Sequence, residues 1–203
     1  MTLEPSQWAT MIARDPEHSH RYAERFRRLA AQGHDLLGEA RTADAIAPRN
    51  ARILDAGCGP GRHGGYLHER GHSVVGVDLD PVLIEVATAE QPGPTWLVGD
   101  LAELDLPSRE IAEPFDVILS AGNVLAFLAP STRRPVLSRL AAHLAPEGRA
   151  LLGFGAGRGY DFDDFRDDVA ASGLNIDAQF ATWDLRPWRA DADFIVTICS
   201  LSS

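Results

Sequence analysis

Short apolar runs alternate along this chain with segments in which apolar residues recur every three or four positions. Apolar runs bounded by glycine, proline or aspartate predict strands. The expected strands are residues 51–57, 72–80, 94–101, 115–122, 149–155, 174–185 and 193–201. The segments with the helical period predict amphipathic helices between them. The expected helices are residues 18–32, 34–47, 61–71, 81–91, 131–148 and 159–173.

Local signals refine some of these elements. Residues 1–17 are polar, so we expect them to lack regular structure. Pro81 suits the first position of a helix, and Asp80 before it suits the cap. Ser131 or Thr132 is the expected cap of the helix over 131–148.

The order of the elements predicts the fold class. From residue 51, strands and helices alternate about every 20 residues, which is typical of an α/β fold with a mostly parallel sheet and helices on both faces, a three-layer αβα sandwich. Residues 186–192 join the last two strands and are too few for a crossover helix, so these strands should pair antiparallel. In parallel sheets of this kind, ligands bind at the carboxyl ends of the strands.

No composition break or repeat divides the chain. We therefore expect a single domain over residues 1–203, with an N-terminal helical cap (1–50) and a Rossmann-like core (51–203).

Charge and composition exclude several classes of function. The net charge is −10, which argues against a nucleic-acid or anionic-membrane partner because phosphates require a basic face. All 19 basic residues are arginine. A Walker phosphate loop and Schiff-base catalysis both need a lysine, so both are excluded.

The same composition argues against secretion and membrane insertion. Cys58 and Cys199 are the two cysteines and form no disulfide framework. The N-terminus lacks the apolar core of a signal peptide, and no apolar run approaches the roughly 20 residues of a membrane span. We expect a cytoplasmic protein, either a monomer or a homodimer.

Residues 53–65, ILDAGCGPGRHGG, contain two overlapping glycine patterns. From Gly59 the pattern is Gly-x-Gly-x-x-Gly, which dinucleotide-binding turns use. From Asp55 it is Asp-x-Gly-x-Gly-x-Gly, with Gly57 directly after the apolar strand. Glycine accepts positive φ and lets a ligand approach the backbone closely, so both patterns predict a small-molecule site.

Carboxylates at three successive strand ends help to separate the two patterns. Asp55 ends the first strand, Asp78 lies 21 residues after Gly57 at the tip of the second, and Asp100 ends the third. Asp78 could accept hydrogen bonds from both hydroxyls of a ribose, which both kinds of cofactor carry. Asp100 could accept from an adenine amine, although a helix-capping role is the alternative. A dinucleotide site has no evident use for Asp100.

Taken together, ILDAGCGPGRHGGYL, VVGVDLDPVLIEVA, WLVGDL and FDVILSAGNVLAFL resemble the successive motifs of class I S-adenosylmethionine-dependent methyltransferases. The resemblance covers roughly residues 50–155. It implies a seven-stranded sheet of order 3-2-1-4-5-7-6 with strand 7 antiparallel. It also implies that S-adenosyl-L-methionine donates a methyl group to a small-molecule acceptor by direct in-line displacement, leaving S-adenosyl-L-homocysteine.

The resemblance assigns cofactor roles residue by residue. Gly57, Gly59 and Gly61 would line the methionine part and the ribose, with Cys58 as a small residue of the same loop. Asp55 would hold the glycine loop or the amino group. The other implied contacts are Asp78 and Leu79 (ribose and adenine), Asp100 and Leu101 (adenine), and Ser120, Ala121 and Gly122 (sulfonium end).

Residues for the acceptor come from segments expected to cover the site. The candidates are Tyr22, Arg25, Asn123, Arg158, Tyr160 and Trp183. The catalytic residue is unassigned, with Tyr22, Asn123 and Tyr160 as candidates, because a general base is needed only for a protonated acceptor. The nearby arginines suggest a polar or anionic acceptor. We expect no metal site, because His63, His68 and His72 lack ligand spacing.

Two other functions remain open from the sequence. The glycine turn and Asp78 also fit an NAD(P)-dependent oxidoreductase. A non-catalytic S-adenosylmethionine-binding protein would keep the same pocket and explain the missing base.

Overall fold

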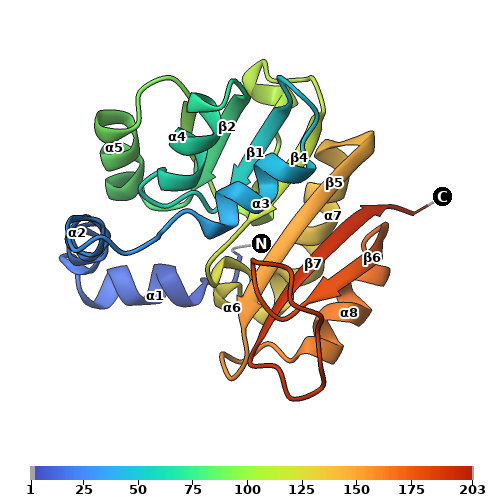
Figure 1. Cartoon of the computed structure of the whole chain (residues 1–203). Coiled ribbons are helices and arrows are strands. Elements are labelled where there is room, and N and C mark those ends of the chain that lie inside the picture. The colour runs from blue at the N-terminus through green and yellow to red at the C-terminus, as the bar shows by residue number, and fades with distance from the viewer. Residues whose placement is uncertain (1–2, 203) are drawn as a thin grey trace.

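The computed structural model describes residues 3–202 and has a central seven-stranded sheet (Figure 1). Its strand order, β3-β2-β1-β4-β5-β7-β6, confirms the expected topology. Strands β1 to β5 pair in parallel, whereas β7 pairs antiparallel with both β5 and β6. The strands are β1 (Arg52–Ala56), β2 (Ser73–Asp78), β3 (Thr95–Val98), β4 (Phe115–Ser120), β5 (Leu144–Gly155), β6 (Leu174–Phe180) and β7 (Phe194–Leu201).

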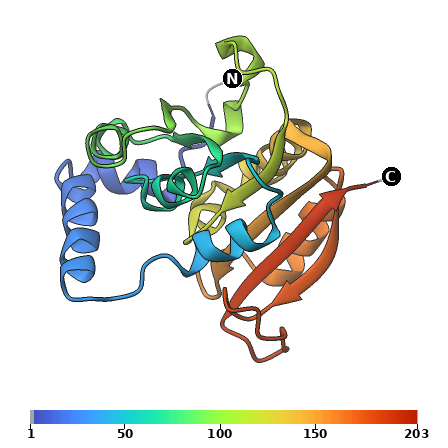
Figure 2. The same cartoon turned by 45° about the horizontal axis from the view of Figure 1, so that its top comes forward.

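Helices cover both faces of this sheet, so the expected three layers are present (Figure 2). The α-helices are α1 (Gln7–Arg14), α2 (His18–Ala31), α3 (Gly38–Ile46), α4 (Arg62–Glu69), α5 (Pro81–Glu90), α6 (Val124–Phe127), α7 (Arg133–His143) and α8 (Phe162–Ala170). Within β1, Ile53 belongs to the core beneath α3 and α4, and Leu54 to the core beneath α7 and α8. Both are fully buried, as expected of a strand covered on both faces.

The N-terminal segment differs from the sequence prediction. Helix α1 lies within the stretch expected to lack regular structure, and Ser6 caps it by accepting a hydrogen bond from Ala9 N–H at 3.0 Å. Trp8, Met11 and Ile12 recur at the helical spacing, so an apolar stripe was present in the sequence, although none of the helix's residues is fully buried. Conversely, the helix expected over 34–47 begins only at Gly38, because Asp35 accepts from Leu37 N–H and closes a turn first.

Helix α7 also begins later than expected. Thr132 occupies its cap position, but the Thr132 hydroxyl donates to the Ala129 carbonyl instead of capping the helix. Ser131 donates to Glu4. The segment after β4 forms the short helix α6, which apolar periodicity over four residues could not reveal. Strand β5 extends back to Leu144, five residues before the predicted start.

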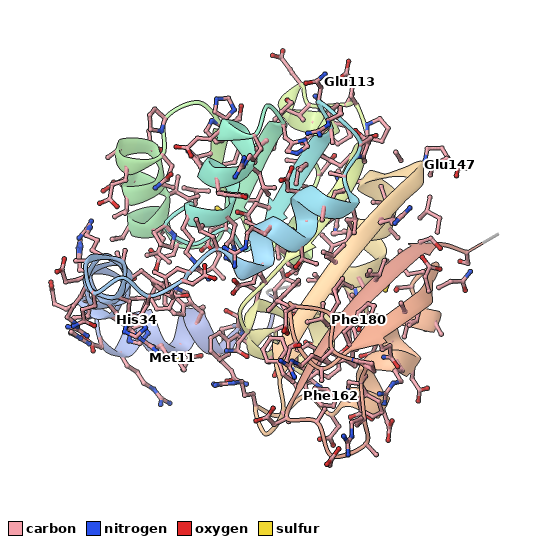
Figure 3. The ribbon with its side chains drawn as sticks, viewed as in Figure 1. Met11, His34, Glu113, Glu147, Phe162 and Phe180 are labelled. Atoms are coloured by element: carbon pink, nitrogen blue, oxygen red, sulfur yellow. The ribbon has the colours of Figure 1, made fainter. Side chains whose placement is uncertain are left out.

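Helices α1 and α2 lie next to each other outside the three layers (Figures 1 and 2). Figure 3 shows the side chains of this region, with Met11 on α1 and His34 after α2 labelled. Over residues 3–202, no helix combines the length and apolar character needed to cross a bilayer.

Candidate functional site

The loop after β1 is built from glycines with left-handed backbone conformations. Gly57, Gly59 and Gly61 have φ values of 83°, 53° and 80°. The N–H groups of Gly57 and Cys58 both donate to the Val77 carbonyl, at 2.8 and 3.1 Å. The loop is therefore fixed to the end of β2, and this leaves Gly57, Cys58 and Gly59 facing a pocket.

The later glycines of the fingerprint serve packing. A Cβ on Gly61, Gly64 or Gly76 would lie 2.9, 2.7 or 2.3 Å from the nearest atom of the Trp96 ring. The Trp96 indole N–H also donates to the Gln91 carbonyl at 2.9 Å. Gly61 and Gly64 thus make room for an indole from β3, and neither lines the pocket. Of the two glycine patterns, the one that begins at Asp55 is the one whose first two glycines, Gly57 and Gly59, face the pocket.

This packing leads to a prediction for Trp96. Replacing Trp96 with phenylalanine removes the indole hydrogen bond and part of the packed ring, which should cost about 1.5 kcal/mol of unfolding free energy. Urea unfolding measures that cost. Ligand affinity of the pocket should change by less than about threefold, with Trp183→Phe as the control indole, which packs against Gly153 on β5. Lost ligand binding at unchanged stability would contradict the packing role.

The three strand-end carboxylates have different surroundings. Asp55 is 1% exposed and accepts from Gly64 N–H at 3.1 Å, and burial raises its pKa. It does not line the pocket, so its contact supports the loop-holding role. Asp100 accepts from Ala102 N–H at 2.9 Å and caps a short 3₁₀ turn. Asp100 also lines the pocket, so capping and ligand contact are compatible.

Asp78 is the best placed of the three to bind a ligand. Its Oδ2 accepts from Gly59 N–H and its Oδ1 from Asp80 N–H, both at 2.9 Å. Burial raises the pKa of Asp78 to about 6, and its two backbone hydrogen bonds only partly oppose this. Each carboxylate oxygen can accept a further hydrogen bond. The carboxylate therefore lies in a partly dry environment with unused acceptor capacity.

One pocket is lined by the glycine loop (residues 57–59), Asp78 and Asp100. It lies at the carboxyl ends of the first four strands, where the parallel topology predicts it. Its volume is about 940 Å³ including the open mouth, which suits a small-molecule site. Trp8 from α1, Tyr22 from α2 and Phe127 from α6 contribute aromatic rings to the wall. Ring centroids of Trp8 lie 5.0 Å from Tyr22 and 6.5 Å from Phe127. We call these three rings the aromatic roof.

Comparison with known proteins identifies the family. Residues 53–148 match the model of a methyltransferase domain family. The structure of a TehB-like SAM-dependent methyltransferase from Corynebacterium glutamicum is 48% identical, with a TM-score of 0.88, and the match covers 93% of this chain and 100% of that one. This chain belongs to the S-adenosylmethionine-dependent methyltransferases.

Curated relatives of this methyltransferase match over part of their length. A malonyl-[acyl-carrier protein] O-methyltransferase from Enterobacter lignolyticus is 34% identical over 44% of this chain and 36% of its own length. A magnesium-protoporphyrin O-methyltransferase from Rhodobacter capsulatus is 29% identical over 66% of this chain and 57% of its own length. The chain thus spans between a third and three fifths of these relatives.

The residues of the methyltransferase pocket fit S-adenosylmethionine. Gly57 and Gly59 carry no side chain that would block a ligand along the loop, and Asp78 has lone pairs for ribose hydroxyls. Leu79, Leu83 and Leu101 line the pocket with Asp100 and would supply apolar contacts for adenine. When bound, the cofactor supplies an electrophilic methyl group. Among residues 3–202, no group of three or more His, Cys, Asp or Glu side chains is arranged to hold a metal ion.

The structure separates the remaining predicted cofactor residues. Ala121 and Gly122 line the pocket at the end of β4. Ser120 does not: it is fully buried, and its hydroxyl has no hydrogen-bond partner among residues 3–202. The Ser120 side chain is therefore enclosed by the protein and does not line the pocket, so its place at the sulfonium end stays a prediction.

Two acceptor candidates lie at the pocket and four do not. Tyr22 and Asn123 line it, and Asn123 also accepts from Gly155 N–H at 3.0 Å, which holds the loop. Arg25 lies on the exposed face of α2, and Arg158 is exposed on the loop after β5. The expectation of a polar or anionic acceptor rested on these two arginines, neither of which lines the pocket, whereas Arg62 does.

Tyr160 and Trp183 are structural residues. The Tyr160 hydroxyl donates to Asp168 at 2.8 Å, and its ring lies between Phe154 and the Arg133 guanidinium. Trp183 packs against Gly153 on β5. Tyr160 is therefore not available as a base.

Sequence reasoning missed several pocket residues. They are Glu4, Ser6, Trp8, Arg62, His63, Leu83, Gly99, Val124, Phe127, Leu128 and Thr132. The only local signal for the first three was the Ser6 cap before an apolar Trp8. His63 is 4% exposed with Nε2 3.6 Å from a Glu39 carboxylate oxygen, a contact that links residues 24 positions apart.

Proposed function

We propose that this protein transfers a methyl group from S-adenosylmethionine to a small-molecule acceptor. The observation that carries the proposal is the single pocket in which the glycine loop, Asp78 and Asp100 face the aromatic roof. The acceptor's lone pair attacks the methyl carbon in line with the sulfur–carbon bond, and the sulfur keeps the bonding electrons. The protein aligns the two partners and excludes water.

The acceptor half of the pocket would be the part remote from Asp78 and Asp100. Ser6, Trp8, Asn123, Phe127 and Thr132 supply aromatic and neutral polar groups there. The arginine that lines the pocket is Arg62, whose guanidinium donates to the Leu36 carbonyl and the Glu39 carboxylate, and the carboxylate of Glu4 is at the same mouth. An uncharged acceptor therefore fits this wall better than an anion, because an anion would lose hydration without gaining a cationic partner.

The residues of this acceptor half are consistent with direct methyl transfer that uses no protein base. Asn123 uses its amide oxygen to hold the loop. Burial raises the pKa of Tyr22, and the neighbouring Arg62 only partly opposes this, so Tyr22 stays protonated and is a poor base. Tyr22 remains a candidate for orienting the acceptor or the cofactor. We further propose a cytoplasmic protein, monomeric or homodimeric, without a nucleic-acid partner, with residues 1–50 as the cap of one domain.

Calorimetric titration tests the cofactor half of the proposal. S-adenosylhomocysteine should bind the wild type with a Kd in the range of about 1–50 µM, whereas NAD should not bind. Binding of NAD alone would favour an oxidoreductase. A panel of uncharged small acceptors incubated with S-adenosylmethionine should then yield a methylated product. Tight cofactor binding with no turnover would favour a non-catalytic binding protein.

A further inference from the structure

Asp80 has more hydrogen-bond partners than a helix cap requires. It is 1% exposed. Its Oδ1 accepts from Val82 N–H at 3.0 Å and caps α5, as the sequence predicted. Its Oδ2 accepts from the Trp8 indole N–H at 2.9 Å and from the Ser19 hydroxyl. One buried carboxylate therefore joins α5 to both α1 and α2.

Helix α1 depends on a small number of such contacts. It contains no buried residue. Trp8 is its aromatic contribution to the roof, packing edge-on against His18 and Tyr22 and stacking on Phe127. Gln7 makes two longer hydrogen bonds, to the carbonyls of Ala126 and Arg158 at 3.4 and 3.3 Å. The charge-assisted bond to Asp80 is the stronger kind of contact.

Asp80 also touches the carboxylate that would hold the ribose. Its backbone N–H donates to Asp78 Oδ1 at 2.9 Å, and Asp78 Oδ2 accepts from Gly59 N–H in the glycine loop. The backbone of one residue thus contacts the cofactor side of the pocket, while its side chain contacts the roof. Any displacement of residues 78–80 would move both.

We propose that Asp80 is a positioning residue that fastens the Trp8 ring over the pocket and couples closure of helices α1 and α2, which carry Trp8 and Tyr22 of the aromatic roof, to cofactor binding. The inference rests on the proposed function. A fastened roof retains the cofactor and excludes water from the methyl group during transfer. Release of S-adenosylhomocysteine then requires the Asp80–Trp8 bond to open.

Three variants separate this role from helix capping. Asp80→Ser retains a good N-cap for α5, and Asp80→Asn retains it when its amide oxygen faces Val82 N–H. In Asp80→Asn, either the amide N–H₂ faces the Trp8 N–H, or the amide flips and loses the cap bond. Trp8→Phe removes only the indole N–H and part of the ring. Asp105→Asn is the control, because the exposed Asp105 side chain accepts from Ser108 N–H at 3.4 Å ahead of the 3₁₀ turn Pro107–Arg109 and does not line the pocket.

The decisive measurement is the dissociation rate of tritiated S-adenosylhomocysteine chased with excess unlabelled ligand. Asp80→Asn, Asp80→Ser and Trp8→Phe should each speed dissociation about tenfold. The double variant Asp80→Asn/Trp8→Phe should be no faster than about tenfold, because both changes remove one contact. Asp105→Asn should match the wild type. Rates within twofold of wild type in the single variants, or multiplied effects in the double variant, would overturn the proposal.

A ligand-free measurement separates this proposal from the proposed function. Trypsin should cut at Arg14 and Arg21 several-fold faster in Asp80→Asn than in the wild type, and bound S-adenosylhomocysteine should slow the wild-type cuts. If the wild type binds no S-adenosylhomocysteine, the proposed function fails and with it the coupling. Faster cutting in Asp80→Asn would then support only the claim that Asp80 holds Trp8 in place. Equal cutting in the variant and the wild type would refute that claim as well.

Discussion

Replacing Gly57 with alanine is expected to remove about 4 kcal/mol of unfolding free energy and to abolish measurable cofactor binding. Gly57 has φ of 83°, where a Cβ is strained by roughly 1–2 kcal/mol. The new Cβ would also lie 2.4 Å from Val124 Cγ2 on α6, and such overpacking typically costs 1–3 kcal/mol. Relief requires the glycine loop and α6 to separate, and both line the pocket.

The chain offers matched controls for strain and for clash. Gly33 has φ of 79° with nothing within 4 Å of a Cβ, and it lies outside the pocket. Gly33→Ala should therefore show the strain alone, about 1 kcal/mol by urea unfolding, with S-adenosylhomocysteine affinity unchanged. Adding Val124→Ala to Gly57→Ala removes both clashing methyl groups and should restore part of the stability. Equal losses in Gly57→Ala and Gly33→Ala would refute the clash.

The sheet could be predicted from the sequence because each strand is recognised from the residues within it. Strand β1 is buried on both faces, so an apolar run ending in Gly57 could be recognised without knowing its neighbours. Asp78 and Asp100 were found because parallel strands bring their carboxyl ends to one edge. Position along a strand was enough to place both beside the glycine loop, and the pocket contains both.

The roof could not be predicted because long-range contacts form it. Trp8 takes its place through Asp80, which is 72 residues away in the chain. Arg158 and Tyr160 were expected at the acceptor because they follow β5, but the Arg133 guanidinium donates to the Gly159 carbonyl and draws this loop toward α7. The spacing of Gly61 and Gly64 resembles a ligand-binding pattern, and only the position of Trp96 shows their packing role.

Replacing Asp78 with alanine is expected to weaken S-adenosylhomocysteine binding by at least about thirtyfold, or roughly 2 kcal/mol. Two hydrogen bonds to the ribose would be lost, and Gly59 N–H would lose the acceptor that fixes the loop. Calorimetric titration measures the loss. Asp116→Ala is a control carboxylate that accepts from Arg52 N–H at the opposite end of β1, and it should bind normally. A less than threefold loss in Asp78→Ala would remove Asp78 from the site.

The pKa of Asp78 adds a pH dependence to that result. In the ligand-free fold, burial raises this pKa from 3.8 to about 6, so Asp78 stabilises the fold most below pH 4, and that contribution is lost as pH rises to about 6. Ribose hydroxyls supply donors to the ionised form, so binding should favour ionisation. Affinity should therefore fall about tenfold from pH 7.5 to pH 5.

Asp78→Asn separates this titration from that of any other ionisable side chain. Its amide cannot ionise, so its weaker binding should vary little between pH 7.5 and pH 5. A wild-type affinity that is flat over this range would mean that the carboxylate is already ionised without ligand. A pH dependence that persists in Asp78→Asn would assign the titration to another side chain. Only a pH dependence of affinity that is present in the wild type and absent in Asp78→Asn would tie cofactor binding to ionisation of the buried Asp78 carboxylate.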